Sequence, residues 1–148
     1  MPLRKDVALD PDKLPAQRVR FDGTEYKNDG ATQWIEVCLS YGDRDAVGRS
    51  ESVASEGEIN DLFATVQATI HAIGELTGDV LDCELTDCDI VRAFRDEFIV
   101  VLIALKFQGR DIRVFGKCRE REELADAAAC ATLDALNQHI TLALENPQ

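Results

Sequence analysis

The spacing of apolar residues along the chain changes from every second position to every third or fourth, and this change occurs twice. In residues 34–41 and 100–107 alternate positions are apolar with the same spacing, which is the period of a β-strand that buries one face. After each run come a polar turn and a second extended segment. Apolar residues then recur every three or four positions, as in an amphipathic helix. The pattern predicts strands followed by a helix, in two successive units.

The two units share the same order of features, which indicates an internal repeat. Ile35 corresponds to Val101, an offset of 66 residues (101 minus 35), and the next three alternating positions keep that offset. In each unit a glycine followed by a basic residue precedes the helix, Gly48-Arg49 in the first and Gly116-Lys117 in the second. Because several kinds of position recur in the same order, we interpret the pattern as a duplication.

A further strand is expected at the start of each unit, near residues 19–26 and 81–94. The predicted fold class is therefore α+β, with two fused βββα units, antiparallel sheets and two helices. The first unit spans 18–78 and the second 79–145, and together they form one compact domain. Residues 1–17 hold three prolines among charged residues and little to bury, so we expect a flexible N-terminal arm.

Each predicted helix has one apolar face. In the first helix Ser55 and Glu58 have the spacing of a capping box, and acidic residues precede the second, where the helix dipole favours anions. The face of the first helix comprises Ile59, Leu62, Phe63, Val66, Ile70 and Ile73, and that of the second Leu124, Ala129, Leu133, Leu136 and Ile140.

The segment 98–105 departs from the alternation because it is apolar on both faces. Such a strand is expected to be covered on both faces, and one helix layer covers only one of them. Trp34 lies on the polar side of its own strand, a position that often marks a contact surface. We therefore expect a homodimer, or a contact between the two units, with interface residues Trp34, Phe98, Val100 and Leu102.

Composition narrows the possible partners. The 148 residues include 45% apolar and 30% charged residues and carry a formal net charge of −12, which opposes binding to nucleic acid or to anionic lipid. There is no run of 18 apolar residues and no apolar stretch typical of a signal peptide near the N-terminus. Five cysteines without a CxxC pair suit reduced thiols, so we expect a cytoplasmic protein.

Motifs of catalysis are missing, and we expect no enzyme, cofactor or metal. There is no GxSxG, phosphate-binding glycine loop or HExxH, and the two histidines, His71 and His139, are interpreted as structural. The acidic stretch 79–89 is interpreted as a solvated strand face, since it lacks the spacing of a calcium loop. In a regular strand Cys83 and Cys88 would point to opposite faces and could not share a metal.

Two segments carry a resemblance to a known family. Residues 57–64 resemble a glycine-initiated helix, and residues 129–137 a last helix, of the C-terminal regulatory domain of 2-isopropylmalate synthase and its citramalate synthase relatives. The strand, turn and strand of 104–116 fit the same domain. The resemblance implies an allosteric dimerisation domain made of two βββα units that binds an end-product amino acid. The family's catalytic barrel has no counterpart in these 148 residues, so a stand-alone module is expected.

The resemblance leads to an expected function. The module would bind a small branched-chain amino acid or a related carboxylate where the glycine-bearing loops meet the helix N-termini, and it could regulate a partner enzyme. Alternatives are a ligand-free interaction scaffold and, less favoured because of the net charge, a module like those that bind double-stranded RNA. The candidate ligand-binding residues are Ser50, Gly57, Ile59, Gly116, Cys118 and Leu124.

Overall fold

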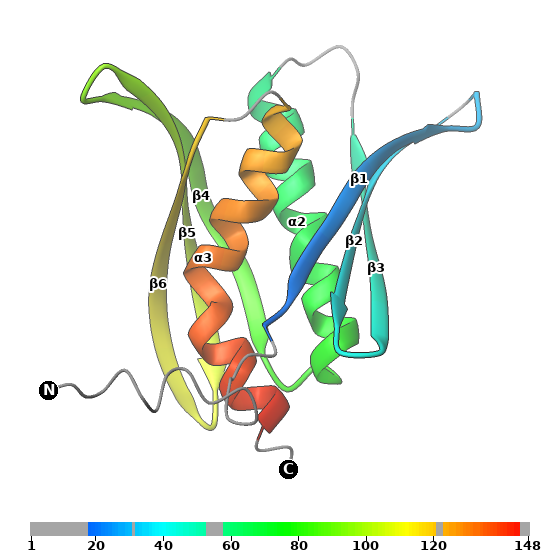
Figure 1. The fold of residues 1–148 in the computed structure, drawn as a ribbon, viewed down its shortest axis with the longest axis vertical. Helices are drawn as coiled ribbons and strands as arrows, with labels where there is room; N and C mark the ends of the chain where they lie inside the picture. Colours follow the sequence, from blue (N-terminus) through cyan, green and yellow to red (C-terminus); the bar gives the residue numbers. More distant parts are fainter. Residues whose placement is uncertain (1–17, 31, 53–57, 121–122, 146–148) are drawn as a thin grey trace, which may run out of the picture.

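The computed structural model describes residues 18–30, 32–52, 58–120 and 123–145. The element order is βββα followed by βββα, which confirms the predicted α+β class and the repeat (Figure 1). The first unit contains β1 (Arg20–Asn28), β2 (Gln33–Tyr41), β3 (Arg44–Ser52) and α2 (Glu58–Thr77). The second contains β4 (Asp82–Ala93), β5 (Asp96–Phe107), β6 (Arg110–Arg119) and α3 (Leu124–Glu145). The predicted arm, residues 1–17, lies outside the described residues.

Each unit forms its own antiparallel sheet, in the order β1-β2-β3 and β4-β5-β6. The two helices lie between the sheets, with α2 packed mainly on the first sheet and α3 on the second (Figure 1). Each helix also contacts the other helix and the first strand of the other unit. Both helices begin at the same end of the molecule. The inner face of each sheet is therefore buried by helix, and the outer faces point away from the molecule.

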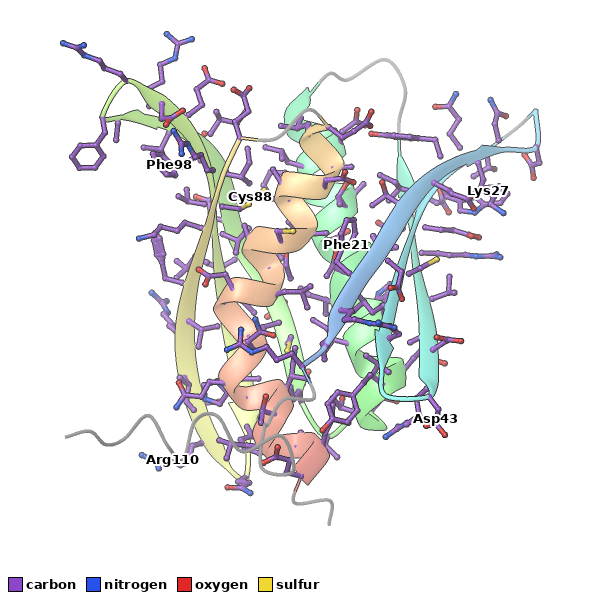
Figure 2. All side chains as sticks on the ribbon, viewed as in Figure 1. Phe21, Lys27, Asp43, Cys88, Phe98 and Arg110 are labelled. Carbon is purple, nitrogen blue, oxygen red and sulfur yellow. The ribbon has the colours of Figure 1, made fainter. Side chains whose placement is uncertain are left out.

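The core follows from the two periods of the sequence (Figure 2). Ile35, Val37 and Leu39 on β2 and their counterparts on β5 are almost completely buried against the helices. The predicted helix faces are confirmed at Leu62, Val66, Ile73, Ala129, Leu133, Leu136 and Ile140, which are buried, and at Phe63, Ile70 and Leu124, which pack against the core. The side chain of Ile59 and the capping residue Ser55 lie outside the described residues.

The recurring glycines allow the helices to approach the sheets closely. A Cβ atom on Gly48 would overlap the carbonyl oxygen of Ala68 in α2, and one on Gly116 would overlap that of Ala131 in α3. The obstacle in each case is helix backbone, which cannot move aside without shifting the helix. The glycine of each repeat is thus required by helix packing.

The expectation that Cys83 and Cys88 face opposite sides is wrong. The register of β4 against β5 shifts between Leu85 and Asp87, so that Cys83 pairs with Leu105 and Cys88 with Val101, both on the inner face. This β-bulge adds one residue to β4 and reverses the side-chain alternation beyond it. Burial raises the pKa of the Cys83 thiol to about 11 and that of Cys88 to about 12.

No helix among the described residues is long and apolar enough to cross a membrane. The described part of the chain also has no group of three or more side chains placed to hold a metal ion.

Candidate functional site: two unlike outer faces

The outer face of the second sheet carries a line of apolar side chains along its central strand. Successive side chains along β5 point to opposite faces of the sheet. Ile99, Val101 and Ile103 point to the helices, and the residues between them point outward. The outward residues are Phe98, Val100, Leu102 and Ala104, which we call the apolar row, and all four are only half-buried. Nothing within the described chain covers this row, although its composition is that of a buried strand.

Charged side chains border the apolar row on both sides, with opposite sign. On β4 the residues opposite the row include Glu84, Asp87 and Asp89, which we call the acidic row. On β6 they include Arg113, Lys117 and Arg119, which we call the basic row. Directly opposed residues in antiparallel strands share a face, so both rows lie on the same outer surface as the apolar row.

The same surface contains a hollow and a projecting ring. A cavity of about 240 Å³ is lined by Asp87, Asp89, Val100, Leu102 and neighbouring residues, with Phe115 at its border. Phe115 pairs with Leu102 in the register of β5 and β6, and 57% of it is exposed. The outer face therefore has a projecting aromatic ring next to a cavity, in addition to its rows of apolar and charged side chains.

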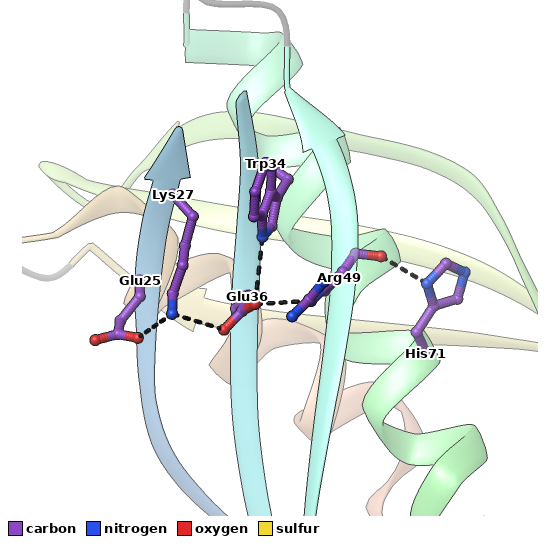
Figure 3. Close-up of polar contacts among 6 residues, drawn as sticks. All are labelled: Glu25, Lys27, Trp34, Glu36, Arg49 and His71. Atoms are coloured by element: carbon purple, nitrogen blue, oxygen red, sulfur yellow. Dashed lines mark hydrogen bonds and ion pairs between the residues drawn. The ribbon is translucent and has the colours of Figure 1, made fainter. Parts of the chain in front are cut away.

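The outer face of the first sheet is different, because a carboxylate occupies its centre. Glu36 lies on β2 and is only 6% exposed (Figure 3). Its carboxylate accepts a hydrogen bond from Trp34 Nε1 at 3.2 Å and pairs with Arg49 Nε at 2.7 Å and Lys27 Nζ at 3.6 Å. The guanidinium of Arg49 also lies 5.6 Å from the centre of the Trp34 ring. This polar network fills the position that apolar residues occupy in the second unit.

These contacts stabilise the charged form of Glu36. The hydrogen bond from Trp34, followed by the charges of Arg49 and Lys27, lowers the pKa of the carboxyl below its ordinary value, against the opposing effect of burial. Glu36 is therefore a buried carboxylate that holds Trp34, Arg49 and Lys27 together on the outer face of the first sheet.

A second hollow lies beside this network. It measures about 590 Å³ and is lined by Thr32, Trp34, Arg49, Ser50, Glu51, Gln67 and His71. Ser50 Oγ donates to Gln67 Oε1 at 3.3 Å. His71 Nδ1 lies 2.7 Å from the carbonyl oxygen of Arg49, and because a carbonyl oxygen only accepts, Nδ1 is the donor in this hydrogen bond. An aromatic face, a guanidinium, an imidazole and an amide thus border one cavity, which we call the Trp34 hollow.

A larger hollow, of about 720 Å³, opens where β3, α2 and β4 meet. Its lining includes Glu75, Asp79 and Asp82 and only one cation, Arg49. Three carboxylates make it a poor site for an anionic ligand.

The structure does not bring the described ligand-binding candidates together in one cavity. Ser50 lines the Trp34 hollow, whereas Gly57 and the side chain of Ile59 lie outside the described residues. Gly116 faces α3, Leu124 packs against the core, and the Cys118 thiol donates to the carbonyl oxygen of Arg119 at 3.3 Å.

The predicted interface residues are divided as well. Trp34 lies on the outer face of the first sheet, and Phe98, Val100 and Leu102 lie on that of the second. The two helices separate these faces, so the four residues do not form one patch (Figure 1).

Sequence reasoning placed the acidic stretch 79–89 on a solvated strand face, but it missed the alignment of the two charged rows with the apolar row and the role of Glu36. The bulge that sets Asp87 and Asp89 beside Glu84 leaves no mark in the pattern. Glu36 could have been suspected, since a carboxylate between Ile35 and Val37 needs a partner if its strand is central.

No family model matches the chain, and no curated protein matches it significantly.

Proposed function

We propose that the protein is a non-catalytic regulatory module that works as a homodimer, and that its subunit contact is the outer face of the second sheet. The observation that carries this proposal is the apolar row with the exposed ring of Phe115 beside it. The resemblance to the regulatory domain of 2-isopropylmalate synthase supports the same function. A partner enzyme would then be controlled through the dimer.

Comparison of the two repeats supports the choice of face. Trp34 and Glu36 in β2 correspond to Val100 and Leu102 in β5, with the offset of 66 residues that relates the two units. The first unit satisfies its outward carboxylate with Trp34, Arg49 and Lys27, and so completes that face within one chain. The second unit leaves apolar side chains half-exposed, and their burial by a second copy is favourable.

Light scattering tests the dimer, with a matched pair of variants. The wild-type protein should be dimeric at tens of micromolar, and Val100→Asp should dissociate it because a dimer would bury an unpaired carboxylate. Val47→Asp makes the same change at an exposed position on the outer face of the first sheet, and it should leave the dimer intact. A monomeric wild type, or dissociation by the Val47 variant alone, would overturn the proposal.

We propose further that the Trp34 hollow takes the effector, a small branched-chain amino acid. The remaining donors of Arg49 suit its carboxylate, Glu51 suits its ammonium group, and the face of Trp34 suits an aliphatic side chain. Ser50, one of the residues singled out in the sequence, borders this cavity together with Gln67.

A thermal-shift series with leucine, isoleucine, valine and their keto acids tests this assignment. A ligand that binds only the native state must raise the melting temperature. Gln67→Ala, an exposed change in the lining, should remove the shift, whereas Gln138→Ala on the exposed side of α3 should keep it. The absence of any shift with the wild type would favour the ligand-free scaffold.

A further inference from the structure

We propose that two copies of the chain pack their second sheets face to face about a two-fold axis parallel to β5. In this arrangement the acidic row of each copy lies over the basic row of the other. The inference rests on the proposed dimer and specifies its geometry. It is carried by the register of the three strands, which sets the charges at matching heights on either side of the apolar row.

Cross-strand pairing defines those heights. Val100 pairs with Asp89 on one side and with Lys117 on the other. Ala104 likewise pairs with Glu84 on one side and with Arg113 on the other. At two levels along β5, therefore, an acid, an apolar residue and a base form a line across the sheet.

The charges in these lines cannot satisfy one another within one chain. The acid and the base lie two strands apart, or about 9.6 Å at the usual strand spacing, with an apolar side chain between them. Among the described residues, none of the side chains of Glu84, Asp89, Arg113 and Lys117 forms an ion pair. Each chain thus leaves the charges of these four side chains available to a partner.

Two symmetric arrangements can bury the apolar row, and the charges select one of them. A two-fold axis along β5 exchanges the β4 side with the β6 side, so Asp89 faces Lys117 of the second copy and Glu84 faces Arg113. An axis across the strands would instead set β4 over β4 and β6 over β6. Like charges that face each other across an interface are unfavourable, and opposite charges favour association. The pattern therefore fits the first arrangement.

The shape of the face agrees with this choice. The axis along β5 places Phe115 of one copy over the β4 side of the other, at the level of Leu102. The hollow bounded by Asp87, Asp89 and Val100 lies at that level. The projecting ring can therefore fill the partner's hollow, and it does so twice because a two-fold contact is isologous.

Charge reversal on the full chain tests the geometry. Lys117→Glu alone and Asp89→Lys alone should each raise the dimer dissociation constant at least tenfold, because both contacts between positions 89 and 117 of each homodimer then oppose like charges. The double variant Asp89→Lys, Lys117→Glu should recover the wild-type constant. An equimolar mixture of the two single variants should form heterodimers, visible as the intermediate mass in native mass spectrometry. Asp45→Lys, the same charge change on the outer face of the first sheet, is the control and should dimerise normally.

The outcomes distinguish a dimer with a different axis from the absence of a dimer. If Val100→Asp dissociates the protein but neither single charge reversal does, the axis along β5 is wrong and the dimer stands. A wild type that is monomeric at tens of micromolar overturns both.

Engineered cysteines supply a second measurement. With the axis along β5 each outward position of that strand faces its own copy, so Val100→Cys and Ala104→Cys should both form disulfide-linked dimers under mild oxidation. The wild type, with its own five cysteines, gives the background. Cross-linking at only one of the two positions would indicate the axis across the strands.

Discussion

Trp34 and Glu36 lie two residues apart on β2 and point to the same outer face, where the indole Nε1 donates to the Glu36 carboxylate at 3.2 Å. The tryptophan that interrupts the apolar alternation is therefore a hydrogen-bond donor to a carboxylate. It is also the only tryptophan in the chain. Its fluorescence consequently reports on the surroundings of this one indole, which include the Glu36 carboxylate.

The first prediction is that Trp34 emission follows the protonation of Glu36. The contacts lower the pKa of Glu36 below its ordinary value of 4.5, so the stability they provide is complete above pH 4.5 and is lost as the pH falls through the lowered pKa. Emission should be flat at higher pH and change with a midpoint below 4.5. Glu36→Gln should abolish this transition and flatten the acid side of the stability curve. A wild-type midpoint above 4.5 in the folded protein would contradict the assigned cause.

The second prediction concerns the contact between β6 and α3. Gly116→Ala places a methyl group against the backbone of Ala131, and it should lower the free energy of unfolding by at least about 2 kcal/mol, as measured by urea denaturation. Gly74→Ala is the control, because the new atom meets only the flexible side chain of Asp79 and alanine favours a helix. The control should be neutral or slightly stabilising. Equal stability of both variants would show that the close approach is not required.

The third prediction concerns the turn between β4 and β5. Ala93 pairs with Asp96, and the two loop residues Phe94 and Arg95 have φ angles of 55° and 64°. A two-residue loop with positive φ at both positions is a type I′ turn, for which Asn-Gly is preferred. Replacing Phe94 and Arg95 by Asn and Gly should raise the free energy of unfolding by about 1–2 kcal/mol. Loss of dimerisation in this variant would instead assign a contact to Phe94, which is 93% exposed.

The fourth prediction is negative and concerns nucleic acids. Among the described residues, the pairing of Arg49 with Glu36 and a basic row of only three residues leave no extended basic surface for a phosphate backbone, and the net charge of the chain is −12. A gel-shift assay at about 0.15 M salt should show no retention of duplex RNA or DNA. Micromolar binding that disappears on Arg49→Glu would mean that the protein is a nucleic-acid module.

The sequence by itself determined the elements and their order. The period of two in β2 and β5 and the period of three to four in the helices come from local geometry, so the pattern alone located the βββα repeat and most of its core. The sequence also singled out Phe98, Val100 and Leu102, because a strand that is apolar on both faces is visible without coordinates. Gly48 and Gly116 were found as repeat markers, although their purpose was not.

Only the tertiary structure determined which residues lie side by side on each face of these elements. The bulge after Leu85 reverses the alternation in β4, which turns Cys88 inward and sets Asp87 and Asp89 beside the apolar row. The separation of Trp34 from Val100 depends on where the helices pack. The acidic and basic rows arise from cross-strand register, which joins residues about 30 positions apart in sequence. Local periodicity sets which way a side chain points, but its neighbours across the sheet are fixed only when the strands pair.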